Sequence, residues 1–179
     1  MFTKISLYTP SIDELDYRQT ILMQPETMDY NKGYDINFVG YHKDTGCIEF
    51  PNDQWIKWYT FWNNNKPISY YAYIVRDIDR QFVGEVNLHY NSKFDWYDMG
   101  IVIEGKYRGL GYSKQAMKLL LIIAFEEYQA KAVHNDFETA RDRAYKLHID
   151  AGFTILNSHS NMIDLVLEKK NYSSIENRE

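Results

Sequence analysis

Six consecutive residues, Arg108-Gly109-Leu110-Gly111-Tyr112-Ser113, have the composition of a phosphate-binding turn. They follow an apolar stretch, residues 99–103, and precede a helical pattern over residues 114–128. Backbone N–H groups in the first turn of a helix have no partner within the helix and lie at the positive end of its dipole. Because glycine has no Cβ, the backbone of this turn can approach a diphosphate closely. The sequence therefore predicts that the turn binds a phosphorylated cofactor.

The overall composition narrows the class of protein. The 179 residues suffice for one domain with a sizeable core, and the 45% of apolar residues predicts a folded chain. A net charge of −5 argues against a general nucleic-acid-binding protein. The single cysteine, Cys47, excludes an internal disulfide and a thiolate zinc cluster, and it fits a reducing cytoplasm. The longest apolar run, residues 119–125, is too short to span a membrane. We therefore expect no metal site, no nucleic-acid partner and no membrane partner.

The turn must be positioned by the strands and helices around it. Apolar patterning and turn residues predict the order β-α-α-β-β-β-α-β-α-β-β. The expected strands cover residues 5–8, 69–75, 82–89, 97–103, 132–134, 153–157 and 162–168. The first expected helix begins at Ser11, which would form a capping box with Glu14. Three further helices are expected over residues 52–62, 112–128 and 140–151. This order predicts an α/β (α+β) fold with a mixed sheet and helices on both faces. We expect residues 1–170 to form one domain, followed by a polar tail over residues 171–179.

Three segments of this order carry a family resemblance. The first is the hairpin and apolar strand before the turn. The second is Arg108-x-x-Gly111-x-Ser113, and the third is a helix that ends in Gly-Phe, residues 144–153. Over residues 68–169 these segments resemble the GNAT superfamily of N-acetyltransferases, whose acetyl-CoA loop is Arg/Gln-x-x-Gly-x-Gly/Ala. Ser113 replaces the last small residue of that loop. The resemblance implies one GNAT-like domain with a mostly antiparallel central sheet, and acetyl-CoA as the acetyl donor.

The resemblance also implies a set of cofactor-binding residues. In the family the pantetheine arm lies along the central strand, so Ile101 and Ile103 would offer backbone groups to it. The pyrophosphate would lie over residues 108–113, including Gly109. Lys114 and Arg141 would add positive charge there.

Two positions in the Gly-Phe helix depart from the family. The family often has an Asn twelve residues before the Phe and a Tyr five residues before it, and here these positions hold Arg141 and His148. The Asn usually helps to hold the cofactor, and the Tyr usually protonates the leaving thiolate. Imidazole titrates near neutral pH, so His148 is our candidate for the thiolate acid. The alternative is a packed, hydrogen-bonded histidine.

Acetyl transfer to an amine also requires that the amine lose a proton before it attacks. Glu85 and His89 lie on the polar face of one expected strand, and Asp98 begins the next. Each is a candidate base, acting directly or through water. The alternatives are that these carboxylates are solvated, or that no dedicated base is needed.

The N-terminal third of the chain is acidic and aromatic. Residues 1–65 contain nine Asp and Glu against five Lys and Arg. The helix expected over residues 52–62 carries a cluster of aromatic residues, which are Trp55, Trp58, Tyr59, Phe61 and Trp62. They form either the core face of that helix or one wall of an acceptor pocket. As a pocket wall, they would favour a cationic amine through charge and cation–π attraction.

Together these features predict an acetyl-CoA-dependent N-acetyltransferase. It would move an acetyl group to a primary amine by direct transfer in a ternary complex. The acceptor would be a small-molecule amine or an amine of a protein or peptide, and the chain could form a homodimer. The main alternative is a non-catalytic acyl-CoA-binding module, a sensor or regulator with the same fold. A third hypothesis, an interaction domain without cofactor, leaves the glycine turn unexplained.

Overall fold

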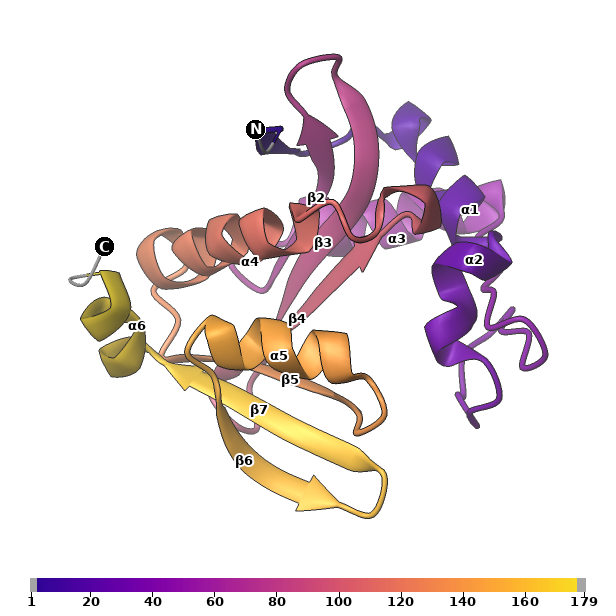
Figure 1. The fold of residues 1–179 in the computed structure, drawn as a ribbon. Helices are drawn as coiled ribbons and strands as arrows, with labels where there is room; N and C mark the ends of the chain where they lie inside the picture. The colour runs from indigo at the N-terminus through magenta and orange to yellow at the C-terminus, as the bar shows by residue number, and fades with distance from the viewer. Residues whose placement is uncertain (1–2, 177–179) are drawn as a thin grey trace.

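A single seven-stranded sheet organises the computed structural model, which describes residues 3–176 (Figure 1). The strands lie in the order β1-β2-β3-β4-β5-β7-β6. Their bounds are β1 Ile5–Tyr8, β2 Ser69–Arg76, β3 Gln81–Asn91, β4 Trp96–Ile103, β5 Ala132–Glu138, β6 Thr154–His159 and β7 Met162–Glu168. All neighbouring strands are antiparallel except β4 and β5, which are parallel. The expected mixed, mostly antiparallel sheet is confirmed.

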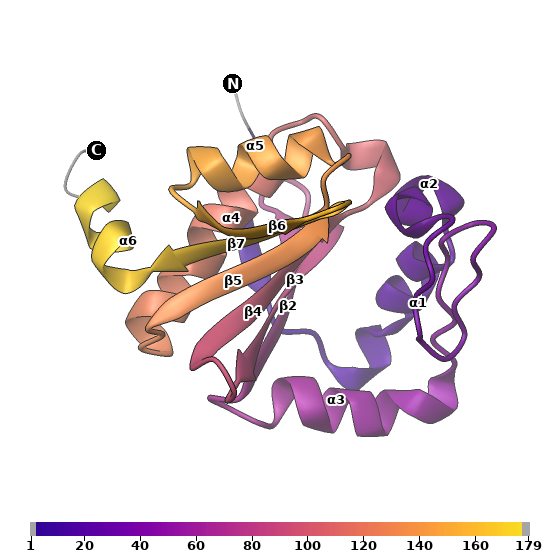
Figure 2. The ribbon, with the colours of Figure 1, turned by 90° about the horizontal axis from the view of Figure 1, so that it is seen from below.

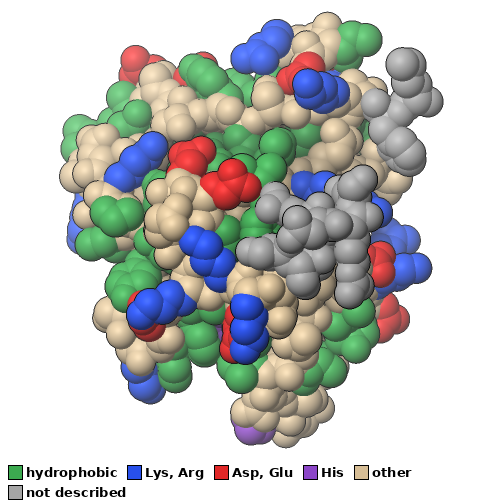
Figure 3. Space-filling model, turned by 90° about the vertical axis from the view of Figure 1, so that its left-hand side faces the viewer, with side chains coloured by type: hydrophobic (Ala, Val, Ile, Leu, Met, Phe, Trp, Pro, Cys, Tyr) green, Lys and Arg blue, Asp and Glu red, His purple; other side chains and the backbone are tan. Residues whose placement is uncertain are grey.

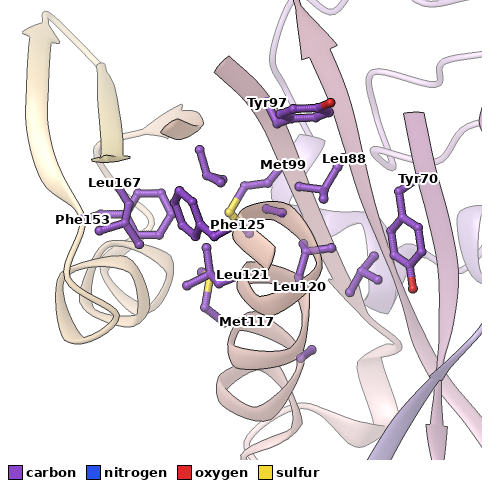
Figure 4. Close-up of a cluster of buried hydrophobic side chains, with 14 of the residues drawn as sticks. Tyr70, Leu88, Tyr97, Met99, Met117, Leu120, Leu121, Phe125, Phe153 and Leu167 are labelled. Carbon is purple, nitrogen blue, oxygen red and sulfur yellow. The ribbon is translucent and has the colours of Figure 1, made fainter. Parts of the chain in front are cut away.

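Helices cover both faces of this sheet, as expected (Figure 2). They are α1 Asp16–Leu22, α2 Pro25–Met28, α3 Trp55–Asn63, α4 Tyr112–Ile122, α5 Asp142–Asp150 and α6 Lys169–Glu176. Helices α4 and α5 lie on one face, and α1, α2 and α3 lie on the other side, next to β2, β3 and β4. A buried apolar cluster holds α4 against its face of the sheet. Figure 4 shows Met117, Leu120 and Leu121 of α4, with Phe125 just after its end, against Leu88 and Met99 of the strands. Burying each such side chain stabilises the fold by about 1.5–3 kcal/mol.

The main differences from the sequence-based expectation concern four segments. The helix expected over residues 112–128 leaves α-helical geometry at Ile122 and continues as a π-helical turn, Ile123–Glu127. The first helix starts with a 3₁₀ turn, Ile12–Glu14, which the expected capping box of Ser11 and Glu14 closes. Strand β5 runs to Glu138 rather than ending at residue 134, because pairing with β7 extends it through a polar stretch that lacks a strand pattern. The expected polar tail begins within α6, and residues 177–179 lie outside the described residues.

A second, smaller core lies under α1 and α2. Its buried members are Leu15, Leu22, Met28, Cys47 and Phe50. The aromatic side chains of α3 border this core, and the ring of Trp58 meets that of Tyr71 on β2 edge-to-face at 4.6 Å. The aromatic cluster of the sequence thus fastens α3 to the sheet, although none of its residues is fully buried.

Candidate functional site

The parallel strands β4 and β5 separate along most of their length (Figure 1). They pair only at Tyr97 with Val133 and at Asp98 with His134, whereas β4 continues to Ile103. Ile101 and Ile103 therefore lie on the stretch of β4 that has no β5 partner. Their side chains pack against the main core, so this stretch offers backbone rather than side chains to the opening between the strands. An extended ligand could add to β4 here as a further strand does.

The glycine turn lies between the end of β4 and the start of α4. A 3₁₀ turn, Gly105–Tyr107, leads into it, and both Gly109 and Gly111 have left-handed backbone, with φ of 80° and 81°. Gly111 is the N-cap of α4, and no side chain caps the helix. A Cβ built on Gly109 would meet nothing within 4 Å. Free N–H groups beside an open turn fit a phosphate group, as the sequence predicts.

Ser113 and Lys114 lie in the first turn of α4. The Ser113 side chain is half-buried and Lys114 is exposed. An exposed Lys at this end of the helix can add charge to an anion site without a fixed geometry.

The guanidinium groups of Arg108 and Arg141 contact residues of α2 and of the 3₁₀ turn that follows it, Asp29–Asn31. Nη1 of Arg108 donates to Oδ1 of Asp29 at 2.9 Å, and Nη2 donates to the carbonyl O of Thr27. Arg141 donates to the carbonyl O of Tyr30 at 3.2 Å and lies over the Tyr30 ring, 4.6 Å from its centroid. Both arginines thus fasten residues 27–30 across the ends of β4 and β5. Their binding of a cofactor stays a prediction.

His148 lies on the inner side of α5, where only 4% of the residue is exposed. Its ring packs between those of Phe137 and Phe153. Nδ1 donates to the carbonyl O of Ala144 at 2.7 Å, so Nδ1 must carry a hydrogen. Nε2 meets the side-chain amide of Asn135 at 2.9 Å. Burial lowers the pKa of His148 and outweighs the Ala144 hydrogen bond. The neutral ring has a lone pair on Nε2, which suits a hydrogen-bond acceptor better than an acid, and the role of thiolate acid stays a prediction.

Because His148 is buried, we expect the free energy of unfolding to decrease as the pH is lowered. The unfolded histidine has a pKa of about 6.5, and the folded one lies lower. As pH falls below about 6.5, the unfolded state binds a proton that the folded state does not, so stability is lost by up to about 1.4 kcal/mol per pH unit. Thermal unfolding at pH 7.5 and 5.5 measures the loss. His148→Gln should reduce it, and an equal pH dependence in both proteins would contradict the prediction.

Glu85 lies inside an ion pair and is only 2% exposed. Its carboxylate binds Nη1 of Arg18 from α1 and accepts a hydrogen bond from the hydroxyl of Tyr71. The Arg18 guanidinium also lies over the rings of Phe50 and Trp58, 5.2 and 4.6 Å from their centroids. Of the aromatic cluster on α3, the ring of Trp58 is thus already occupied by a cation of the chain itself. A base role for Glu85 stays a prediction that this ion pair does not favour.

Asp98 and His89 lie on the same face of the sheet as Glu85, opposite α4. Oδ1 of Asp98 accepts a hydrogen bond from Nδ1 of His134 at 2.8 Å. His89 contacts the rings of Phe61 and Trp62, with centroids 5.4 and 6.1 Å away. The structure thus brings Glu85, His89 and Asp98 to one face, as the alternation along β3 and β4 predicts.

Sequence reasoning missed Arg18, His134 and Asn135. Arg18 occupies an ordinary position of an amphipathic helix, so nothing local marks it. His134 is the last residue of the expected strand 132–134, and Asn135 begins the polar stretch in which the rest of β5 was not recognised. A prediction that β5 lies parallel to β4 in this register would have placed His134 beside Asp98.

We also searched the described part of the chain for metal sites, membrane-spanning helices and basic surface patches. Residues 3–176 contain no group of three or more His, Cys, Asp and Glu placed to hold a metal ion. None of the helices within these residues has the length and hydropathy needed to cross a membrane. On the face shown in Figure 3, basic side chains are scattered among acidic and hydrophobic ones. Nucleic-acid-binding proteins instead gather basic side chains into a patch or stripe.

Comparison with known proteins adds a family and a set of similar folds. A family model described as an acetyltransferase (GNAT) domain matches residues 6–154. No curated protein matches the sequence. Spermidine N-acetyltransferase from Vibrio cholerae, in complex with CoA and spermine, is 13% identical with a TM-score of 0.75, covering 94% of this chain and 98% of that chain. FdhC, a nucleotide-linked sugar GNAT without ligand, is 16% identical with a TM-score of 0.72, covering 99% and 93%. At these identities the likeness is one of fold.

Proposed function

Because the chain belongs to the family of GNAT acetyltransferases, we propose that it transfers an acetyl group from acetyl-CoA to a primary amine by direct transfer in a ternary complex. The observation that carries the proposal is the opening between β4 and β5, which leads to an uncapped helix preceded by two left-handed glycines. An extended arm with a diphosphate at one end needs both features. The Vibrio cholerae enzyme of the same fold is described in complex with CoA.

Two backbone segments of this chain would bind different parts of acetyl-CoA. The backbone of residues 109–114 would hold the pyrophosphate, and the unpaired stretch of β4 with Ile101 and Ile103 would hold the pantetheine arm. Acetyl-CoA supplies an acetyl group already activated as a thioester. Binding both substrates side by side removes the entropy cost of their meeting, which is a large part of such a barrier.

The state of the single cysteine supports direct transfer. Cys47 is 3% exposed and lies in the second core among Leu15, Leu22 and Met28. A thiol enclosed in this way cannot reach a thioester, so an acyl-cysteine intermediate is not favoured. Initial rates measured against both substrates test this point, because a covalent intermediate gives ping-pong kinetics and a ternary complex does not.

The open face of the sheet supports a cationic amine as acceptor. Asp136 on β5 and Asp164 on β7 are paired in register, on the face that carries Asp98 and His134. Such a face attracts an ammonium group. The similar structures include one in complex with spermine and one described as a nucleotide-linked sugar GNAT. For this chain we propose a primary amine that is protonated in solution.

Acetyl-CoA is expected to stabilise the folded chain. At 100 times its Kd, a ligand of the folded state contributes about 2.7 kcal/mol, which raises the Tm of a chain of this size by roughly 5–10 °C. A thermal-shift series with acetyl-CoA and CoA measures this. Release of CoA thiol is then followed with spermidine, an amino-sugar nucleotide and peptides with a free N-terminal amine. No shift at saturation contradicts the cofactor site, and a shift without thiol release supports the acyl-CoA-binding module instead.

A further inference from the structure

Asp98 and His134 form a hydrogen-bonded pair at the point where β4 and β5 separate. They are the last residues that the two strands pair, and Nδ1 of His134 lies 2.8 Å from Oδ1 of Asp98. Both side chains lie on the sheet face opposite α4, because Met99, between Asp98 and Gly100, points into the main core. The pair therefore stands on the acceptor side of the opening that the proposed function assigns to the thioester arm.

The pair is held rigidly by its neighbours. Oδ1 of Asp98 also accepts a hydrogen bond from Nε1 of Trp96 at 3.0 Å, and Oδ2 accepts one from Nδ2 of Asn91 at 3.0 Å. The ring of Trp96 stacks on the imidazole of His134 at 4.5 Å and an angle of 14°. These contacts leave the imidazole little freedom to rotate.

The Asp98 carboxylate determines which nitrogen of His134 carries hydrogen. Burial raises the pKa of Asp98, but hydrogen bonds from His134 and Asn91 outweigh it and hold the pKa below its ordinary value. An ionised carboxylate only accepts hydrogen bonds, so Nδ1 carries hydrogen and Nε2 of the neutral ring has a free lone pair. Nε2 has no hydrogen-bond partner within residues 3–176, and 11% of the His134 side chain is exposed.

The other candidate bases on this face are less suited to accept a proton. Glu85 is bound by Arg18 and Tyr71. Asp98 is engaged by three donors. His89 lies against two aromatic rings, and no carboxylate of the described residues is hydrogen-bonded to it. An Asp–His pair orients an imidazole and stabilises the cation that forms on it, and catalytic bases commonly use this arrangement.

We propose that His134 is the general base for the acceptor amine and that Asp98 is its positioning residue. The inference rests on the proposed acetyl transfer. Nε2 takes one proton from the acceptor ammonium, directly or through one water, and later releases it to solvent. The nitrogen lone pair then forms the C–N bond to the acetyl carbon, and the C–S bond breaks with its electron pair on sulfur. The remaining proton lost by nitrogen goes to the thiolate, so that the products are the amide and the CoA thiol.

Two amines that differ in protonation separate this role from a structural one. Spermidine is an alkyl ammonium at neutral pH and needs a base, whereas hydroxylamine is largely unprotonated and does not. For His134→Gln we expect kcat/KM to fall by about 10²–10³-fold with spermidine, the usual size of a general-base effect. We expect a much smaller fall with hydroxylamine and an unchanged thermal shift with acetyl-CoA. His159→Gln, on the exposed edge strand β6, is the matched control and should change neither rate.

Asp98→Asn tests the positioning role through the pH profile. The charged groups that face His134 are Asp98 on β4, Asp136 on β5 and Asp164 on β7, and His89 on β3 is paired with Asp98. Removing the carboxylate next to the imidazole destabilises the imidazolium, so the acid limb of kcat/KM with spermidine should move to lower pH. A merely structural role would lower the whole profile without moving it.

The possible results discriminate between the inference and the proposed function. Equal losses with both amines in His134→Gln, or no loss with spermidine, would overturn the inference while acetyl transfer stands. Acetylation of hydroxylamine alone by the wild-type chain would also overturn it, because the chain would then lack a working base. If the wild-type chain acetylates neither amine and acetyl-CoA gives no thermal shift, the proposed function fails, and the inference fails with it.

Discussion

Gly111→Val is expected to abolish acetyl-CoA binding in a chain that still folds. Gly111 is the N-cap of α4 and has φ of 81°, a conformation that a β-branched residue adopts only under strain. Valine would therefore move the backbone N–H groups that the proposal assigns to the pyrophosphate. Each hydrogen bond to a charged group contributes about 1.5–3 kcal/mol. Losing one of them weakens binding by about 10- to 150-fold, and losing two weakens it by about 10²- to 10⁴-fold.

The measurement is the thermal shift with acetyl-CoA, supported by calorimetric titration. Gly33→Val is the matched control, because Gly33 has nearly the same backbone conformation, with φ of 88°, and open space around its Cβ position. Both variants bear the same kind of strain, so both should unfold at lower temperature than the wild-type chain. Only Gly111→Val should lose the shift. Normal affinity in folded Gly111→Val would mean that the phosphates bind elsewhere.

Glu85→Ala is expected to lower the free energy of unfolding by about 3–5 kcal/mol, the cost of removing one partner of a buried ion pair. The side chain of Arg18 is 15% exposed and that of Glu85 is 3% exposed, so water cannot replace the lost carboxylate. The hydroxyl of Tyr71 would lose its acceptor as well. Thermal or urea unfolding measures the loss, which corresponds to a Tm lower by roughly 10 °C.

An exposed ion pair is the matched control for this effect. Asp35 pairs with Lys43 at 2.5 Å, but its side chain is 92% exposed, and Asp35→Ala should leave the Tm unchanged. The double variant Arg18→Met with Glu85→Leu should recover much of the loss, because an apolar pair of similar volume carries no buried charge. A Tm for Glu85→Ala within error of the wild-type value would show that the ion pair contributes little.

The sequence by itself determined the architecture and the place of the glycine turn. Alternating apolar residues predicted the strands, and the structure confirms the mixed sheet with helices on both faces. The glycines of residues 108–113 predicted a tight turn before a helix, and both have the left-handed backbone that such a turn needs. These features could be predicted because periodicity and backbone freedom are properties of neighbouring residues. The binding roles assigned to that turn stay predictions.

Only the tertiary structure decided which side chains meet. Arg18 reaches Glu85 across 67 residues, and His134 reaches Asp98 across 36. Arg108 is bonded to Asp29, 79 residues away, although its position in the turn favoured a phosphate. Strand register and helix packing determine which side chains come into contact, and both depend on the whole core rather than on any local pattern. The same long-range pairing ends the β4–β5 ladder at Asp98 and His134, and so decides where the sheet opens and which histidine stands beside the opening.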